Sequence, residues 1–308
     1  FLIGHGTLRI NVVGFEARDL KENELREMKE LLTESLNEGA SGLSSGLEYP
    51  PGMYAKMEEL VELCKLVKEK NGLYSTHMRN EGDFLIEAAN EAIEICMRTG
   101  VSLEISHLKA EGKSNWGKVN DVLKLIENAR MKGFDVSCDF YPYNASSTFL
   151  TYILPPWSLV GGIPKLIERL KDPSTRRKII RDIEEGLKDW RSIVKSIGWD
   201  NILIIACSKT HEHEGKNIYE ISKILNKDPY DVAIDLLIEN NASVLAVYFT
   251  MSEDDIISIL KAPYSMIGSD GNGSTKTYCH PRCFGTFPRV IARYVKEKKI
   301  ISVEELVK

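Results

Sequence analysis

Two histidines in this sequence have the spacing of metal ligands on neighbouring strands. His77 ends the run Tyr-Ser-Thr-His and His107 ends the run Glu-Ile-Ser-His, 30 residues later, which is the length of one strand and one helix. Active sites of parallel α/β barrels form at the carboxyl ends of the strands, and imidazole is the commonest metal ligand in proteins. We therefore expect both rings to lie in one pocket around a metal ion.

These two histidines cannot complete a catalytic metal site. A single histidine at a strand end is more often a structural hydrogen-bonding group, but a pair one strand-helix unit apart favours ligation. Each is also followed two residues later by a cation, Arg79 or Lys109. A catalytic zinc ion uses three protein ligands and keeps one position open. We therefore expect at least one further ligand from elsewhere.

Asp270 has the chemistry of a general acid and base. It lies in Gly-Ser-Asp-Gly, at the end of a strand expected over residues 264–269. Asp-Gly is also a common turn pair, so a plain turn aspartate remains an alternative. Beside a metal ion, such a carboxylate can take a proton from water and pass it to a leaving amine.

Two other clusters contain metal-ligand residue types in less favourable contexts. His211 and His213 would share one face of a strand, but they run into the polar turn Glu-Gly-Lys-Asn. Cys279, His280 and Cys283 lie within five residues and have no second ligand pair nearby. We expect neither cluster to hold a metal ion.

Several polar side chains lie at or just after the expected strand ends, where a substrate would bind. Cations at these positions suit an anionic group, and arginine can hold a carboxylate with two parallel hydrogen bonds. The candidates are Tyr49, Arg79, Lys109, Tyr141, Ser147 and Arg282.

The elements that position these residues follow a regular rhythm up to about residue 140. Short apolar runs alternate with amphipathic helices, which predicts a parallel sheet built from strand-helix units. Asp83 and Asn115 are typical helix caps. The expected strands are 2–3, 42–46, 72–76, 102–106 and 134–138, with helices at 22–38, 54–70, 83–99 and 116–131.

The rhythm breaks after Tyr141, and residues 144–262 read as an insertion before the last strand. This insertion contains a charged helical stretch over 163–196 and a strand over 201–208. Insertions at the carboxyl face of a barrel serve as lids or substrate walls. Near the end of the chain, Ser302 is typical of the first cap of a helix.

Composition restricts the partners of the chain. It has 308 residues, 43% of them apolar, and a formal charge of -5. Its basic and acidic residues are interspersed, so neither nucleic acid nor a membrane surface is an expected partner. The longest apolar runs, 202–207 and 242–249, are far below the roughly 20 residues that cross a bilayer. Six scattered cysteines indicate a reducing cytoplasm.

Six motifs occur in order along the chain: 42–52, 76–79, 105–110, 139–143, 269–271 and 280–289. They read GLSSGLEYPPG, THMR, ISHLKA, DFYPY, SDG and HPRCFGTFPR. Together they closely resemble the N-acyl-D-amino-acid deacylases, or D-aminoacylases, of the amidohydrolase superfamily. The resemblance implies a (β/α)8 barrel that uses zinc to hydrolyse the amide of an N-acyl-D-amino acid.

The resemblance also implies roles for single residues. His77 and His107 match zinc ligands of barrel strands five and six, and Asp270 matches the general base and acid of strand eight. The substrate-binding positions are matched by Lys109, Tyr141 and Ser147, and less securely by Tyr49 and Arg282. His211 and His213 fall in the insertion, between strands seven and eight.

The chain departs from the family at its amino end. The resemblance leads us to expect a first strand with His-x-His and a second with a metal-binding cysteine, and neither is in this sequence. The six strands would therefore be strands three to eight of an incomplete barrel with exposed edges.

Two alternatives to a deacylase stay open. Cyclic-amide hydrolases of the dihydroorotase and hydantoinase type share the barrel and the histidines. They normally use a lysine on strand four, and the run 42–46 contains no lysine. A metal-free, non-catalytic barrel fragment is the other alternative.

Overall fold

The computed structural model describes residues 1–271 and 278–307 and divides the chain into two compact units. The first unit comprises Phe1–Ala110, Gly117–Phe140 and Ile257–Gly268. The second unit comprises Glu111–Trp116, Tyr141–Ile256 and Ser269–Lys308. The chain therefore crosses between the two units several times.

The first unit contains a six-stranded parallel sheet in the order β1-β2-β3-β4-β5-β9. Five of its strands follow one another along the chain, which confirms the parallel α/β arrangement predicted from the rhythm of apolar runs. The bounds are β1 Ile3–Gly4, β2 Gly42–Gly46, β3 Leu73–His77, β4 Ser102–Ile105, β5 Val136–Phe140 and β9 Ser265–Ile267.

Close contact between β2 and β3 depends on a glycine. Gly42 has a φ of +154°, and a Cβ atom there would lie 1.9 Å from the carbonyl oxygen of Leu73. The resulting register places Gly46 opposite His77. The last residue of β3 is therefore at the carboxyl edge of the sheet.

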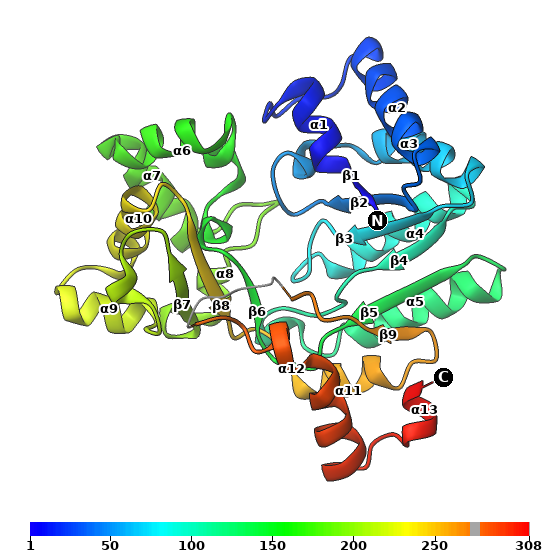
Figure 1. The fold of residues 1–308 in the computed structure, drawn as a ribbon. Coiled ribbons are helices and arrows are strands. Elements are labelled where there is room, and N and C mark those ends of the chain that lie inside the picture. The colour runs from blue at the N-terminus through cyan, green and yellow to red at the C-terminus, as the bar shows by residue number, and fades with distance from the viewer. Residues whose placement is uncertain (272–277, 308) are drawn as a thin grey trace. The chain divides into compact units, whose positions relative to one another are not determined.

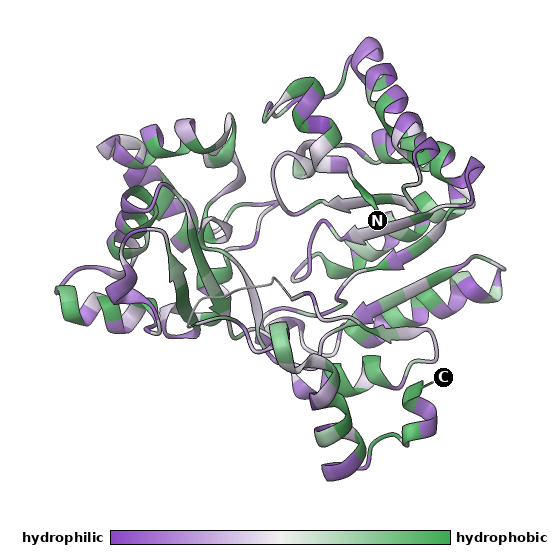
Figure 2. Cartoon of the chain, in the orientation of Figure 1, coloured by the Kyte–Doolittle hydropathy of each residue, from purple (hydrophilic) through white to green (hydrophobic). Residues whose placement is uncertain are grey.

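Helices connect these strands. The helices are α1 His5–Val13, α2 Glu22–Asn37, α3 Met57–Glu69, α4 Leu85–Thr99 and α5 Val119–Met131. The four from α2 to α5 are amphipathic and bury their apolar sides against the sheet. Helices α2 to α5 follow one another along the sheet (Figure 1) and carry alternating polar and apolar stripes (Figure 2). The buried side chains of α4, such as Leu85, Ala89 and Ile93, recur at the spacing of one helical face.

Two predicted helix caps were wrong. Helix α4 starts at Leu85, because the Asn80 side chain accepts hydrogen bonds from the amides of Gly82 and Phe84 and holds this segment as a turn. Asn115 lies in the short helix η2 (Lys113–Asn115), and Gly117, with a φ of +93°, separates it from α5.

The second unit contains a three-stranded antiparallel sheet in the order β6-β8-β7. Its strands are β6 Ser146–Phe149, β7 Ile202–Cys207 and β8 Val244–Tyr248. The runs ILIIAC and VLAVY are rich in β-branched residues, which favour strands, and Figure 2 shows these strands as hydrophobic. Strand β6 was not predicted, because Ser-Ser-Thr-Phe has too few apolar residues to be recognised.

Helices cover the apolar face of this sheet. The continuous helical stretch predicted over 163–196 is three helices, because Pro173 starts a new helix capped by the Asp172 side chain and Gly186 ends it with a φ of +82°. The bounds are α6 Gly162–Lys171, α7 Pro173–Glu185, α8 Ile193–Ile197, α9 Ile218–Leu225 and α10 Pro229–Glu239. Short helices η3 Leu150–Ile153, η4 Pro156–Leu159 and η5 Trp199–Asn201 complete the layer.

A buried carboxylate, that of Glu111, links distant parts of the second unit. Its oxygens accept hydrogen bonds from Ser146 at 2.9 Å, Tyr152 at 2.9 Å and Thr250 at 3.3 Å. The Arg191 guanidinium pairs with the same carboxylate at 3.0 Å. The charge and the lone pairs of Glu111 are therefore compensated by residues far apart in the sequence.

The chain returns to the first sheet through α11 (Glu253–Leu260), and β9 pairs in parallel with β5. The predicted strand 264–269 is thus shorter, and Asp270 lies three residues beyond its end. Helices α12 Arg282–Arg289, η7 Val290–Glu297 and α13 Val303–Val307 follow. Ser302 accepts the amide hydrogen of Glu305, which confirms the predicted cap. Lys308 lies outside the described residues.

Within the described part of the chain, every helix is too short or too polar to cross a membrane.

Candidate metal centre

The two histidines lie together at the carboxyl edge of the first unit's sheet, as the spacing predicted. His77 is the last residue of β3, and His107 follows β4 by two residues. Nδ1 of His77 lies 3.0 Å from Nε2 of His107, and the ring centroids are 4.7 Å apart. One nitrogen of each imidazole is therefore directed at the other ring.

A carboxylate holds the other nitrogen of each ring. Glu48, in the loop after β2, lies 3.1 Å from Nε2 of His77, and Glu81, in the loop after β3, lies 3.0 Å from Nδ1 of His107. Metal-binding histidines usually donate their outer N–H to such a carboxylate, which fixes the tautomer and the ring orientation. The inward pair, Nδ1 of His77 and Nε2 of His107, is thus arranged to face a cation.

Glu81 was missed by the sequence analysis. Donor atoms of His77, Glu81 and His107 all lie within 4.8 Å of one another. Both carboxylate oxygens of Glu81 also accept hydrogen bonds from the Lys109 ammonium at 2.6 Å. The sequence did contain a signal, because Glu81 follows the strand-end residue His77 by four positions. We considered the cation Arg79 in this segment instead.

The charges in this cluster move its pKa values in opposite directions. Burial lowers the pKa of His77, but Glu81 and Glu48 outweigh it and raise that pKa above its ordinary value. Burial and the Lys109 ammonium together lower the pKa of His107. Burial raises the pKa of Glu81, but Lys109 and the two histidines hold it well below its usual range.

The backbone at His107 is strained and is held by β5. His107 has a φ of +41°, a left-handed conformation that is uncommon for this residue type and frequent at functional sites. The carboxylate of Asp139 accepts the His107 amide hydrogen, and the Asp139 carbonyl accepts that of Leu108 at 2.8 Å. A Cβ atom at Gly268 would lie 2.0 Å from the Asp139 carboxylate, so only glycine fits there.

Two further candidates of this unit have different surroundings. The Tyr49 ring lies 4.9 Å from the His77 ring, so it belongs to the cluster. Arg79, in contrast, pairs with Glu91 at 2.8 Å and donates to the carbonyls of Met53 and Ala55. Arg79 therefore ties loops together, and its interpretation as a substrate-binding residue is not supported.

Four other candidates meet in the second unit. The carboxylate of Asp270 lies 2.8 Å from the Arg282 guanidinium, which is almost fully buried. This guanidinium stacks 4.7 Å from the centroid of the Tyr141 ring and donates to the carbonyl of Ser147 at 3.1 Å. Asp270 also has a positive φ of +44°. The structure thus brings Asp270, Arg282, Tyr141 and Ser147 together.

The hydroxyl of Ser147 is held within the sheet. It donates to the carbonyl of Ala246 on β8 at 3.0 Å. Ser147 is therefore a fixed part of β6, and its carbonyl oxygen is the atom that orients Arg282.

The clusters judged unfavourable in the sequence are engaged in structural contacts. Nδ1 of His211 pairs with Glu214 at 2.9 Å on an exposed helix end. The His280 ring donates from Nε2 to the carbonyl of Ala145 at 2.9 Å and accepts the Arg282 amide hydrogen at Nδ1, 3.0 Å away. Both ring nitrogens of His280 are used, so this ring offers no lone pair to a metal ion.

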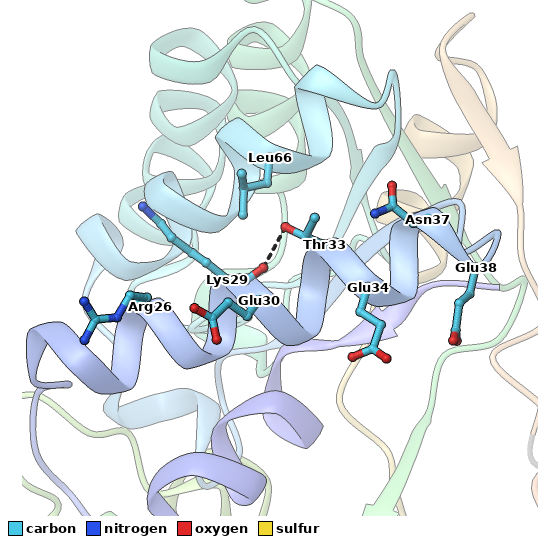
Figure 3. A pocket seen from close by; sticks show the side chains of 8 residues that line it. All are labelled: Arg26, Lys29, Glu30, Thr33, Glu34, Asn37, Glu38 and Leu66. Atoms are coloured by element: carbon cyan, nitrogen blue, oxygen red, sulfur yellow. Dashed lines mark hydrogen bonds between the residues drawn. The ribbon is translucent and has the colours of Figure 1, made fainter.

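The first unit also has a groove whose lining contains none of the site residues discussed so far (Figure 3). It lies along α2 and α3, and its side chains are mostly charged. It is lined by Arg26, Lys29, Glu30, Thr33, Glu34, Asn37, Glu38 and Leu66. None of these is a predicted site residue.

The fold and the histidine pair indicate a class of protein. An α/β protein with paired imidazoles at the carboxyl edge of a parallel sheet has the arrangement of an amidohydrolase. No family model matches the chain. Two curated proteins of Alcaligenes xylosoxydans xylosoxydans match the chain: a D-aminoacylase at 32% identity and an N-acyl-D-glutamate deacylase at 31% identity. Each alignment covers 99% of this chain and 53% of the relative.

Solved structures agree with these matches. One is an N-acyl-D-glutamate deacylase from Bordetella bronchiseptica, complexed with zinc and a phosphonate inhibitor (TM-score 0.78, 30% identity, 99% of this chain and 55% of that one). Another is a D-aminoacylase described as defining a novel subset of amidohydrolases (TM-score 0.77, 33% identity, 99% and 54%). The chain is similar to D-aminoacylases of the amidohydrolases over 99% of its own length, and it spans about half the length of these relatives.

Proposed function

We propose that this chain supplies the metal-binding and substrate-binding residues of a zinc-dependent enzyme that hydrolyses N-acyl-D-amino acids to a D-amino acid and a carboxylate. The observation that carries the proposal is the pair of inward nitrogens of His77 and His107, 3.0 Å apart, each ring held from behind by a carboxylate. The similarity to D-aminoacylases and the zinc in a similar deacylase support it.

We further propose that the six parallel strands are strands three to eight of a (β/α)8 barrel. The segment 144–262 would then be an insertion between strands seven and eight that forms a substrate wall. Four of the six cysteines are buried, as is usual for cysteines outside disulfides, which supports the reducing cytoplasm expected from the sequence.

The donor set fits a zinc ion. Neutral imidazole nitrogens are zinc ligands, and the inward nitrogens of His77 and His107 lie 3.0 Å apart, while Glu48 and Glu81 support the outer nitrogens. His77 and His107 would hold the ion through their inward nitrogens. When bound, zinc polarises the acyl carbonyl and lowers the pKa of water.

Asp270 would move the proton in this reaction. Its carboxylate accepts a proton from the attacking water and returns it to the nitrogen of the scissile amide, so that a neutral amine leaves. The ion pair with Arg282 fixes the direction of the Asp270 carboxylate before the substrate binds.

Lys109 or Arg282 would hold the α-carboxylate of the substrate. Both cations are nearly fully buried, where a hydrogen bond between opposite charges is stronger than in water. Tyr141, Ser147 and Tyr49 would be further substrate-binding residues. A fixed grip on the carboxylate leaves only one enantiomer with its amide in the reactive position.

The experiment combines zinc analysis with the release of free D-amino acid from N-acetyl-D-glutamate and N-acetyl-D-leucine, with N-acetyl-L-leucine as the control. It uses this chain alone and the chain preceded by the amino-terminal strands expected from the family. Bound zinc with D-specific release in either form supports the proposal. Zinc without D-specific release, or neither zinc nor release in both forms, would overturn it.

A further inference from the structure

The carboxylate of Glu81 contacts both a proposed metal ligand and a proposed substrate-binding residue. Its side chain is only 3% exposed. Oε1 lies 3.0 Å from Nδ1 of His107, and both oxygens lie 2.6 Å from the Lys109 ammonium. Lys109 also lies 2.8 Å from the same ring nitrogen. One buried anion is thus shared by two groups with different proposed tasks.

The loop that carries Glu81 is held on both sides of it. Arg79 is fixed by Glu91 and by two backbone carbonyls, and the Asn80 side chain closes the turn that follows. Glu81 therefore cannot easily withdraw from the cluster. Because the same carboxylate bonds both groups, a change in the hydrogen bond between Glu81 and His107 instead changes the bond between Glu81 and Lys109.

A cation bound to His107 sets the direction in which these two bonds of Glu81 change. A cation on the inward Nε2 of His107 draws electron density from the imidazole and makes its outer N–H a stronger donor. Glu81 then bonds His107 more strongly and holds Lys109 less tightly. The Lys109 ammonium becomes a better partner for a substrate carboxylate.

We propose that Glu81 is a positioning residue shared by His107 and Lys109, and that it couples metal binding to the binding of the substrate carboxylate. This inference rests on the proposed function. Because coupling between two ligands is reciprocal, a substrate carboxylate that takes over Lys109 also leaves Glu81 to support His107, and so raises the affinity for the metal ion.

The test measures two constants in the Glu81→Gln variant: the zinc dissociation constant, by competition with a chromogenic chelator, and KM for N-acetyl-D-leucine at saturating zinc. Loss of an outer carboxylate is expected to weaken zinc binding by about 10–100-fold. Loss of the anion that competes for Lys109 is expected to lower KM by about 3–10-fold. A variant with a damaged fold would instead bind both zinc and the substrate more weakly.

Two further variants make the result specific. Glu87→Gln removes an exposed carboxylate of α4, the helix that follows the Glu81 loop, and both constants should stay at their wild-type values. Lys109→Met, which needs no change at Glu81, should raise KM and leave zinc binding as tight as in the wild type or tighter. This variant keeps the test decisive if Glu81→Gln does not fold.

The shared role is contradicted if Glu81→Gln binds zinc as tightly as the wild type, or if KM rises together with the zinc dissociation constant. Weaker zinc binding in Lys109→Met contradicts it as well. Absence of D-specific turnover in the wild type would instead overturn the proposed function, and the zinc constants, which need no turnover, would still decide whether Glu81 supports His107.

Discussion

The two units carry two different kinds of candidate functional cluster. In the first unit, His77 and His107 come from adjacent parallel strands, and their positions follow from the length of one strand-helix repeat. In the second unit, Asp270 and Arg282 meet Tyr141 and Ser147 across more than 120 residues of sequence. The residues of the first cluster are brought together by consecutive strand-helix units, whereas those of the second are brought together by contacts between distant parts of the sequence.

The electrostatics of the two clusters also differ. The first is a network in which two imidazoles and Lys109 share the carboxylates of Glu48 and Glu81. The second is a single ion pair, with a buried guanidinium and a half-exposed carboxylate. A network of this kind suits a cation held in place, and a single exposed carboxylate suits a group that exchanges protons.

The largest expected effect is the loss of the metal ion from the first cluster. His77→Ala or His107→Ala should lose stoichiometric zinc and lower kcat/KM by more than about 100-fold, beyond the usual effect of an outer-sphere residue. Atomic absorption and D-amino acid release measure the two quantities. His211→Ala, at an exposed position, is the matched control and should keep its zinc. Stoichiometric zinc in both site variants would contradict the assignment.

The second cluster should affect turnover without affecting the metal ion. Asp270→Asn should lower kcat by about 10²–10⁴-fold, the range for a general acid and base, and leave the zinc content nearly unchanged. Asp254→Asn, at an exposed position of the same unit, should have wild-type kinetics. Full activity in Asp270→Asn would exclude the proposed role.

Stability should depend strongly on the buried charge of the second unit. Glu111→Ala leaves Arg191 without its counter-charge and should lower the free energy of unfolding by about 3–5 kcal/mol. The control Glu168→Ala removes an exposed pair with Lys165 and should cost less than about 1 kcal/mol. Urea unfolding compares the two, and equal costs would mean that the Glu111 network does not stabilise this unit.

The sequence predicted the first unit better than the second for a physical reason. The alternation of strands and helices is visible in the local spacing of apolar residues, so β2 to β5 and the histidine pair could be located from the sequence. Glu81 and Asp139 act through contacts that only the folded chain makes, so neither the position of Glu81 four residues after His77 nor that of Asp139 in the motif 139–143 revealed their roles. Strand β6 is polar, and its position depends on pairing with β8, 99 residues away.

A smaller effect should appear in the pH dependence of stability. Burial and the neighbouring Arg282 lower the pKa of His280 to about 4. A neutral His280 thus stabilises the folded state above its ordinary pKa, and this stabilisation is lost as the pH falls towards 4. Between pH 7.5 and 5 the wild type should lose about 2 kcal/mol more than His280→Gln. Parallel stability curves for the two proteins would contradict this.

The most direct test of the metal centre is the position of zinc in a crystal of the zinc-loaded protein, measured by anomalous scattering at the zinc edge. We expect a peak about 2.0–2.1 Å from both Nδ1 of His77 and Nε2 of His107, with Glu48 and Glu81 still on the outer nitrogens. A peak at another site, or no peak at this pair, would contradict the assignment of these histidines as the metal ligands.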